Sequence, residues 1–188
     1  MFSPIVERAL AVALEAHSGQ MRKGSNVPYS VHPLHVALIA ARWDGDEATI
    51  AAALLHDVVE DCPEWTLAEL DERFGAEIAD VVRQLTEDKA GTWEERKEHA
   101  IASIPRLTDR ACVVKAADKL HNLESLAAAL RAARAETGDT NAVWARFKGG
   151  RERTLVKDRR LLDALTVRVP ARIADELSRA LADVEAAG

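Results

Sequence analysis

Helix start and stop signals recur along the whole chain and separate its apolar segments. Thr66 to Glu69 and Thr92 to Glu95 both have the Thr-x-x-Glu pattern of a capping box, whose side chains satisfy the first backbone N–H groups of a helix. Ser3 before Pro4 is another helix start, because Ser suits the N-cap and Pro the first helical position. No segment alternates apolar and polar residues over the length of a strand. The sequence therefore predicts an all-α fold.

Composition and length agree with this prediction. Hydrophobic residues make up 48% of the chain but aromatic residues only 4%, and Ala and Leu are prominent, which favours helix. A chain of 188 residues fits one domain with a sizeable core. We expect residues 1–188 to form a single domain.

Glycine and proline residues mark where the predicted helices end. The segment 50–55 is apolar nearly all round, so we expect the helix that contains it to be central and buried. Residues 19–31 contain two Gly and a Pro and are expected to form a loop. The helices are expected at roughly 4–17, 33–43, 46–61, 67–74, 76–87, 92–104, 109–135, 141–165 (with a break at Gly149-Gly150) and 170–186.

Charge and cysteine content exclude several classes of protein. The net charge of −6 argues against nucleic-acid binding driven by overall charge, although a local basic pocket for an anion stays open. Cys62 and Cys112 lie far apart in sequence, so we expect two reduced thiols rather than a disulfide scaffold or a structural zinc site. We see no signal peptide and no membrane-length apolar run, and therefore expect a cytoplasmic protein without a membrane partner. The oligomeric state is left open.

The end of the buried helix carries an unusual group of polar residues. At about 100° per residue, His56, Asp57, Glu60 and Asp61 fall within roughly a 140° arc of one helix face. Carboxylates at a buried C-terminal helix end repel one another, lose hydration and oppose the helix dipole. A divalent cation would resolve this conflict. The alternative is a solvated helix end whose acids face water, and this segment alone leaves both open.

Two further segments contribute candidate ligands. His32 stands at a loop-to-helix junction, and Asp118 interrupts an apolar run in which Lys115 offers a purely structural partner. The resulting set of nitrogen and oxygen donors suits Mn²⁺, Fe²⁺, Mg²⁺ or Zn²⁺. Such an ion acidifies water and polarises a phosphoryl oxygen, and Glu60 and Asp61 could orient that water or accept its proton. The complete predicted ligand set is His32, His56, Asp57 and Asp118.

Five ordered blocks resemble one known family. The chain is similar to the HD-domain phosphohydrolases, and more narrowly to the small alarmone hydrolases of the metazoan Mesh1 type and the hydrolase domain of the Rel/Spo enzymes. The similarity covers roughly residues 5–125 and leaves residues 140–188 as divergent C-terminal helices. The blocks are AHSGQMRKGSNVPYSVHP at 16–33, AALLHDVVED at 52–61, FG at 74–75, LTEDKAGTWEERK at 85–97 and VKAADKLHNL at 114–123.

The resemblance implies a helical HD-domain bundle and a defined chemistry. It implies one divalent ion, usually Mn²⁺, held by the four predicted ligands, and a role for Glu60-Asp61 in activating the hydrolytic water. The implied activity is removal of the 3′-pyrophosphate from the alarmone (p)ppGpp. Some relatives act as phosphatases on NADPH, so another nucleotide is the alternative substrate. A catalytically silent nucleotide-binding or structural protein is a third hypothesis, which the intact set of site residues disfavours.

Several polar and basic residues are expected to meet the substrate. The loop residues Arg22 and Lys23 could bind a purine and phosphate, Lys97 could meet the distal phosphates, and Asn122 is expected near the ribose or the water. Similar hydrolases carry a Trp, then a basic residue and a Tyr, along the nucleotide pocket. Here Trp144 is followed by Lys148 as the stand-in basic residue, but Glu152 takes the place of the Tyr. This departure affects the choice of nucleotide and leaves the metal ligands unchanged.

Overall fold

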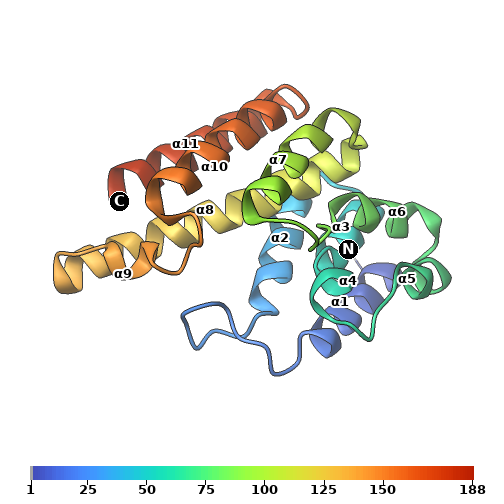
Figure 1. Cartoon of the computed structure of the whole chain (residues 1–188). Coiled ribbons are helices and arrows are strands. Elements are labelled where there is room, and N and C mark those ends of the chain that lie inside the picture. The colour runs from blue at the N-terminus through green and yellow to red at the C-terminus, as the bar shows by residue number, and fades with distance from the viewer. Residues whose placement is uncertain (1) are drawn as a thin grey trace. The chain divides into compact units, whose positions relative to one another are not determined.

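The computed structural model describes residues 2–188 and confirms the all-α fold (Figure 1). Within these residues the only β-type pairing is an isolated bridge between Met21 and Pro28, inside the predicted loop. No described helix is long and apolar enough to cross a membrane. The elements are α1 (Pro4–Ala16), α2 (Val31–Arg42), α3 (Glu47–Leu55), α4 (Val58–Asp61), α5 (Leu67–Phe74), α6 (Ala76–Leu85), α7 (Trp93–Ser103), the 3₁₀ helix η1 (Ile104–Arg106), α8 (Asp109–Thr137), α9 (Asn141–Trp144), α10 (Gly150–Thr166) and α11 (Ala171–Ala187).

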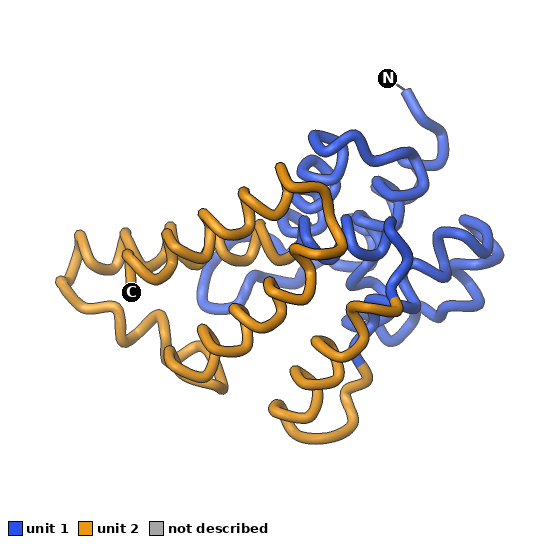
Figure 2. Tube along the Cα trace, turned by 90° about the horizontal axis from the view of Figure 1, so that it is seen from above, with its two compact units in different colours: residues 1–87, 107–118 blue, residues 88–106, 119–188 orange. Residues whose placement is uncertain are grey.

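The helices form two compact units, shown in separate colours in Figure 2. The first unit comprises residues 1–87 and 107–118, and the second comprises residues 88–106 and 119–188. Helix α8 begins in the first unit and continues in the second, and the change falls directly after Asp118.

Helix α3 is the centre of the first unit, as its apolar sequence predicts. It packs against α1, α2 and α6. Ala51, Ala52, Ala53 and Leu55 are fully buried, and Leu54 is nearly so. Three consecutive alanines allow neighbouring helices to approach closely, so the end of α3 is held firmly where the site residues begin.

The predicted helix over 46–61 is wrong in one respect, because the chain breaks at His56-Asp57. Helix α3 ends at Leu55, and the four-residue α4 begins at Val58. Nδ1 of His56 donates to the carbonyl oxygen of Ala53, 2.8 Å away, which offers that carbonyl a side-chain partner in place of the helical N–H. Asp57 then adopts φ −99° and ψ −7°, the bridge region where many active-site residues lie.

Other helix boundaries lie within a few residues of the prediction. Helix α2 begins at Val31 rather than at residue 33, so Pro33 lies in its first turn, where a missing N–H costs nothing. The predicted break within 141–165 is confirmed, because α9 ends at Trp144 and α10 begins at Gly150, directly after Gly149. A Cβ at Gly149 would lie 2.7 Å from the ring of Trp93, so close packing against this ring requires glycine.

The second unit is held together by packing and by an acid-base ladder. Helix α10 packs against α7, η1 and α11. Glu94 and Glu98 of α7 form ion pairs with Arg153, Lys157 and Arg160 of α10. Lys119, which directly follows Asp118, forms a largely buried ion pair with Asp158 of α10 at 2.8 Å. These contacts fix the helices that carry the divergent C-terminal sequence.

Asp46 caps helix α3, and we expect its replacement to destabilise the first unit. Oδ1 of Asp46 accepts the backbone N–H of Thr49 at 2.9 Å, and Arg110 pairs with the same carboxylate at 2.6 Å. Asp46→Ala removes both interactions and should lower the free energy of unfolding by about 1–2 kcal/mol. Asp46→Asn keeps the cap, loses only a half-exposed ion pair and should cost about 0.2–1 kcal/mol. Urea denaturation measures both, with the exposed Glu72→Gln of α5 as control.

The stabilisation that the Asp46 carboxylate provides depends on pH in a defined direction. The hydrogen bond from Arg110 holds the pKa of Asp46 well below its usual range. A carboxyl group whose pKa is lowered by folding stabilises the protein fully above the pKa of the unfolded chain, and the stabilisation is lost as the pH falls below about 4. The wild type and Asp46→Asn should therefore converge in stability at acid pH. If the difference in free energy of unfolding between the wild type and Asp46→Asn stays constant down to acid pH, this account is wrong.

Candidate metal centre

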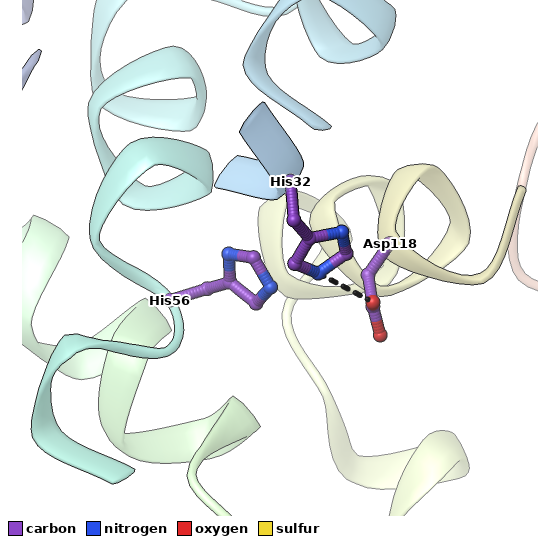
Figure 3. Close-up of side chains that lie close together, drawn as sticks. All are labelled: His32, His56 and Asp118. Atoms are coloured by element: carbon purple, nitrogen blue, oxygen red, sulfur yellow. Dashed lines mark ion pairs between the residues drawn. The ribbon is translucent and has the colours of Figure 1, made fainter. Parts of the chain in front are cut away.

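The side chains of His32, His56 and Asp118 converge in the first unit (Figure 3). His32 lies in the first turn of α2, His56 directly follows α3, and Asp118 lies on α8. One ligand atom from each lies within 4.8 Å of the others. Nε2 of His32 is 3.3 Å from Oδ1 of Asp118. The two imidazole centroids are 5.2 Å apart and both rings are buried, so the donor atoms face one another away from water.

The tautomer of His56 is set by the break between α3 and α4. A carbonyl oxygen only accepts, so Nδ1 of His56 must carry the proton in its bond to Ala53. In the neutral ring, Nε2 then presents a lone pair to the cluster. This arrangement, with one ring nitrogen bonded to a carbonyl, is the one that fixes metal-binding histidines in proteins.

Asp57 contributes a fourth donor atom to the same cluster. Its Oδ2 lies 3.2 Å from Nε2 of His56 and 3.5 Å from Nε2 of His32. The contact pairs the carboxylate with the ring of His56, although the buried Nε2 makes no hydrogen bond of good geometry. The structure thus brings His32, His56 and Asp118 together, with Asp57 beside the two histidines, and the role of all four as ligands stays a prediction.

The electrostatics of the cluster favour a positive charge at its centre. Burial lowers the pKa of His56, but the negative charges of Asp57 and Asp118 outweigh it and raise that pKa to about 9. Burial disfavours the charged form of Asp118, yet the hydrogen bond with His32 and the charge of Lys115 hold its pKa well below the usual range. Lys115 is 3.7 Å from Asp118, so the structural partner considered from sequence is also present.

The donor set fits a divalent ion. It offers two imidazole nitrogens and two carboxylates, without sulfur, in a buried site. Nε2 of His56 is an orphaned buried polar atom, and a metal ion is the kind of partner that a ring nitrogen of this tautomer takes. The lone pairs and negative charges that converge here repel one another unless a cation or protons compensate them.

Glu60 and Asp61 lie on α4, next to the cluster in sequence. Oε2 of Glu60 accepts the backbone N–H of Glu87 at 3.0 Å, which anchors this carboxylate. Burial raises the pKa of Glu60, and the negative charges of Asp57 and Asp61 also raise it. The hydrogen bond from Glu87 lowers this pKa, but the net shift is upward. A carboxylate with a raised pKa beside a site of this kind is suited to accepting a proton.

Tyr29 is a site residue that the sequence did not single out. Its hydroxyl donates to Oδ2 of Asp57 at 2.7 Å and lies 3.4 Å from Oδ2 of Asp61. Burial and the charges of Asp57, Asp61 and Asp118 raise its pKa above the usual range, so the hydroxyl keeps its proton. In the sequence, its position three residues before His32 is the signal that could have identified it as a site residue.

The predicted substrate residues fall in both units. Arg22 and the exposed Lys23 lie in the loop of the first unit, and the guanidinium of Arg22 lies over the ring of Tyr29 at 5.9 Å. Lys97, Asn122 and Lys148 belong to the second unit, so their approach to the metal cluster stays a prediction.

The Trp144 region differs from a nucleotide-stacking surface. Trp144 is only 5% exposed and packs against Phe147, with ring centroids 5.8 Å apart. A Cβ at Gly188 would lie 2.9 Å from the Trp144 ring, so Gly188 packs closely against this ring. Glu152 is exposed on the first turn of α10.

Comparisons with known proteins agree with this geometry. A family model described as "HD domain" matches residues 9–154. The guanosine-3′,5′-bis(diphosphate) 3′-pyrophosphohydrolase MESH1 of Xenopus tropicalis is 39% identical over 125 residues, which cover 65% of this chain and 69% of that protein. A 3′-pyrophosphohydrolase of Haemophilus influenzae is 36% identical over 121 residues, but the match spans only 18% of that longer protein.

Two solved structures share the fold over most of the chain. One is described as a metazoan ortholog of SpoT that hydrolyzes ppGpp; it has a TM-score of 0.79 at 29% identity and covers 96% of this chain and 95% of its own. The other is lmo0812 from Listeria monocytogenes, with a TM-score of 0.68 at 34% identity over 80% of this chain and 96% of its own. The matched family model and the extent of the MESH1 similarity show that the chain belongs to the HD domain family.

Proposed function

We propose that this protein is a metal-dependent hydrolase that removes the 3′-pyrophosphate of guanosine (p)ppGpp. The observation that carries the proposal is the buried convergence of His32, His56 and Asp118 in a chain that matches MESH1 over 69% of that protein's length. The reaction consumes one water and cleaves the bond between the 3′-oxygen and the pyrophosphate. The ribose keeps a hydroxyl group and pyrophosphate leaves.

The residues of the cluster take complementary roles in this proposal. His32, His56, Asp57 and Asp118 hold the ion, which we propose to be Mn²⁺, with Fe²⁺, Mg²⁺ or Zn²⁺ as alternatives. A bound divalent ion supplies positive charge that acidifies water and polarises a phosphoryl oxygen. Glu60 accepts the proton of the attacking water, and Asp61 orients that water.

The substrate is held by basic and amide side chains outside the cluster. We assign Arg22 and Lys23 to the base and phosphates, Lys97 and Lys148 to the phosphates, and Asn122 to the ribose. Asn122 follows Asp118 by one turn of α8, which supports its place near the reacting end of the substrate. We also propose that residues 1–188 act as one HD-domain phosphohydrolase with 140–188 as its divergent C-terminal part, and that it works in the cytoplasm.

A second candidate is a related phosphohydrolase that acts on another nucleotide, such as NADPH. The departure at Glu152 favours it, because an acid stands where similar hydrolases carry a Tyr along the nucleotide pocket. Under this alternative the metal cluster keeps its role and the nucleotide contacts differ.

A Mn²⁺-supplemented assay on a nucleotide panel separates the two functions. With ppGpp as substrate we expect pyrophosphate and no orthophosphate, because the diphosphate leaves intact. With NADPH the second candidate instead predicts orthophosphate release. Each reaction is run with and without excess EDTA, and loss of turnover in EDTA establishes metal dependence. Turnover of neither nucleotide, together with no bound divalent ion, would rule out the enzyme.

A further inference from the structure

The hydroxyl of Tyr29 lies between a candidate metal ligand and a candidate water-orienting residue. It is 2.7 Å from Oδ2 of Asp57 and 3.4 Å from Oδ2 of Asp61. A phenol has one proton to donate, so the short contact with Asp57 is the hydrogen bond of consequence. The Oδ2 atom that receives it is the one that faces both His32 and His56. The bond therefore acts on the oxygen that completes the cluster.

Backbone hydrogen bonds and a ring contact hold Tyr29 in place. Its backbone N–H donates to the carbonyl oxygen of Gln20 at 2.9 Å, and its own carbonyl accepts the N–H of His32 at 2.8 Å. Its ring packs on the ring of His17, with centroids 4.7 Å apart. One residue thus joins the base of the loop, the first turn of α2 and the carboxylate of Asp57.

The ring that supports Tyr29 is also fixed. Nδ1 of His17 bonds to Oε1 of Gln20 at 2.9 Å, and Nε2 of Gln20 donates to the backbone oxygen of Asp61 at 3.4 Å. Sγ of the buried Cys62 donates to the carbonyl of Ala16 at 3.2 Å, which ties the end of α4 to the end of α1. These contacts therefore hold the ring of Tyr29 in the position from which its hydroxyl meets Asp57.

We propose that Tyr29 is a positioning residue of the metal centre, whose hydroxyl keeps Oδ2 of Asp57 turned toward His32 and His56. Rotation about the last side-chain bond of an aspartate is broad, so a carboxylate without such a partner samples other orientations. Outer partners of ligating carboxylates are typically worth 10–100-fold in metal affinity or activity. The proposal rests on the metal-dependent function given above.

Tyr29→Phe tests the hydroxyl, because phenylalanine keeps the ring that packs on His17. We expect the dissociation constant for Mn²⁺ alone, measured by titration calorimetry, to rise about tenfold. At saturating Mn²⁺, kcat for ppGpp should fall by about the same factor while KM stays within about twofold. Ser103→Ala is the control, because it deletes one hydroxyl that donates to the carbonyl of Ala100, outside the site.

The outcomes separate this inference from the proposed function. If the wild type binds Mn²⁺ but hydrolyses no nucleotide, the proposed function fails and the Mn²⁺ affinity of Tyr29→Phe still decides the role of Tyr29. If Tyr29→Phe binds Mn²⁺ and turns over substrate like the wild type, the positioning role is wrong even though the enzyme is real. A purely structural role predicts a lower melting temperature with unchanged Mn²⁺ affinity, which also overturns the inference.

The wild type offers a second test that does not depend on the folding of a variant. Tyr29 is the only tyrosine in the chain, so tyrosine labelled with ¹³C at Cζ gives one resonance that reports on this site. Stoichiometric Mn²⁺ should broaden that resonance by its paramagnetism, and Mg²⁺ should not. A resonance that stays sharp with Mn²⁺ bound would place the phenol away from the ion and refute the proposal.

Discussion

His56→Ala is expected to abolish stoichiometric metal binding and to reduce hydrolysis by more than about 100-fold, the upper end of what outer partners of a metal site contribute. The variant removes Nε2, the buried ring nitrogen without a hydrogen-bond partner, from the centre of the cluster. It leaves Asp57 and Asp118 facing His32 with one nitrogen atom fewer in the cluster. Asp57→Ala should have the same effect through the loss of Oδ2.

Elemental analysis of purified protein and Mn²⁺ titration calorimetry measure this loss. His35→Ala is the matched control, because it makes the same chemical change at an exposed position of α2, the helix that carries His32. The control should bind one equivalent of metal and keep wild-type turnover. A His56→Ala protein that is folded and still binds one equivalent of Mn²⁺ with wild-type affinity would show that the ligand set is misassigned.

Glu60→Gln is expected to lower kcat by about 10²–10⁴-fold while metal stays bound, because an amide does not accept the proton of the attacking water. The amide oxygen can still accept the N–H of Glu87, so the local anchor is preserved. Glu60→Ala should lower turnover in the same way. Glu64→Gln, an exposed change in the same segment, should leave kcat and metal content unchanged.

The pH profile adds an independent check on Glu60. Burial raises its pKa, and activity needs the ionised form, so kcat should fall as the pH drops through a value above the usual glutamate range. This acid limb should be absent from the residual activity of Glu60→Gln. Loss of bound metal in Glu60→Gln would instead mean that Glu60 is a ligand rather than the base.

The sequence predicted most helices because their signals are local. The capping boxes at Thr66 and Thr92 form as expected, and each satisfies N–H groups within one turn of its own helix. The helix break at His56-Asp57 was missed because it depends on a side chain bonding to the backbone, and helical periodicity does not register such a bond.

The candidate site was predictable in part for a related reason. His56 and Asp57 follow the most apolar helix, so a buried polar group needed an explanation from sequence alone. Tyr29 was missed because its partner Asp57 lies 28 residues away, and a single tyrosine after a loop carries no periodic signal. The roles of Lys97, Asn122 and Lys148 stay predictions, because these residues lie in the second unit.

The alanine run of α3 limits how this enzyme can be engineered. Ala51, Ala52 and Ala53 are fully buried, so any larger side chain there must displace a neighbouring helix. His56 takes its orientation from the carbonyl of Ala53, and a displaced α3 would turn that ring away from His32. Libraries aimed at new substrates should therefore leave α3 untouched and vary the exposed residues of the 21–27 loop, which carries the proposed substrate residue Lys23.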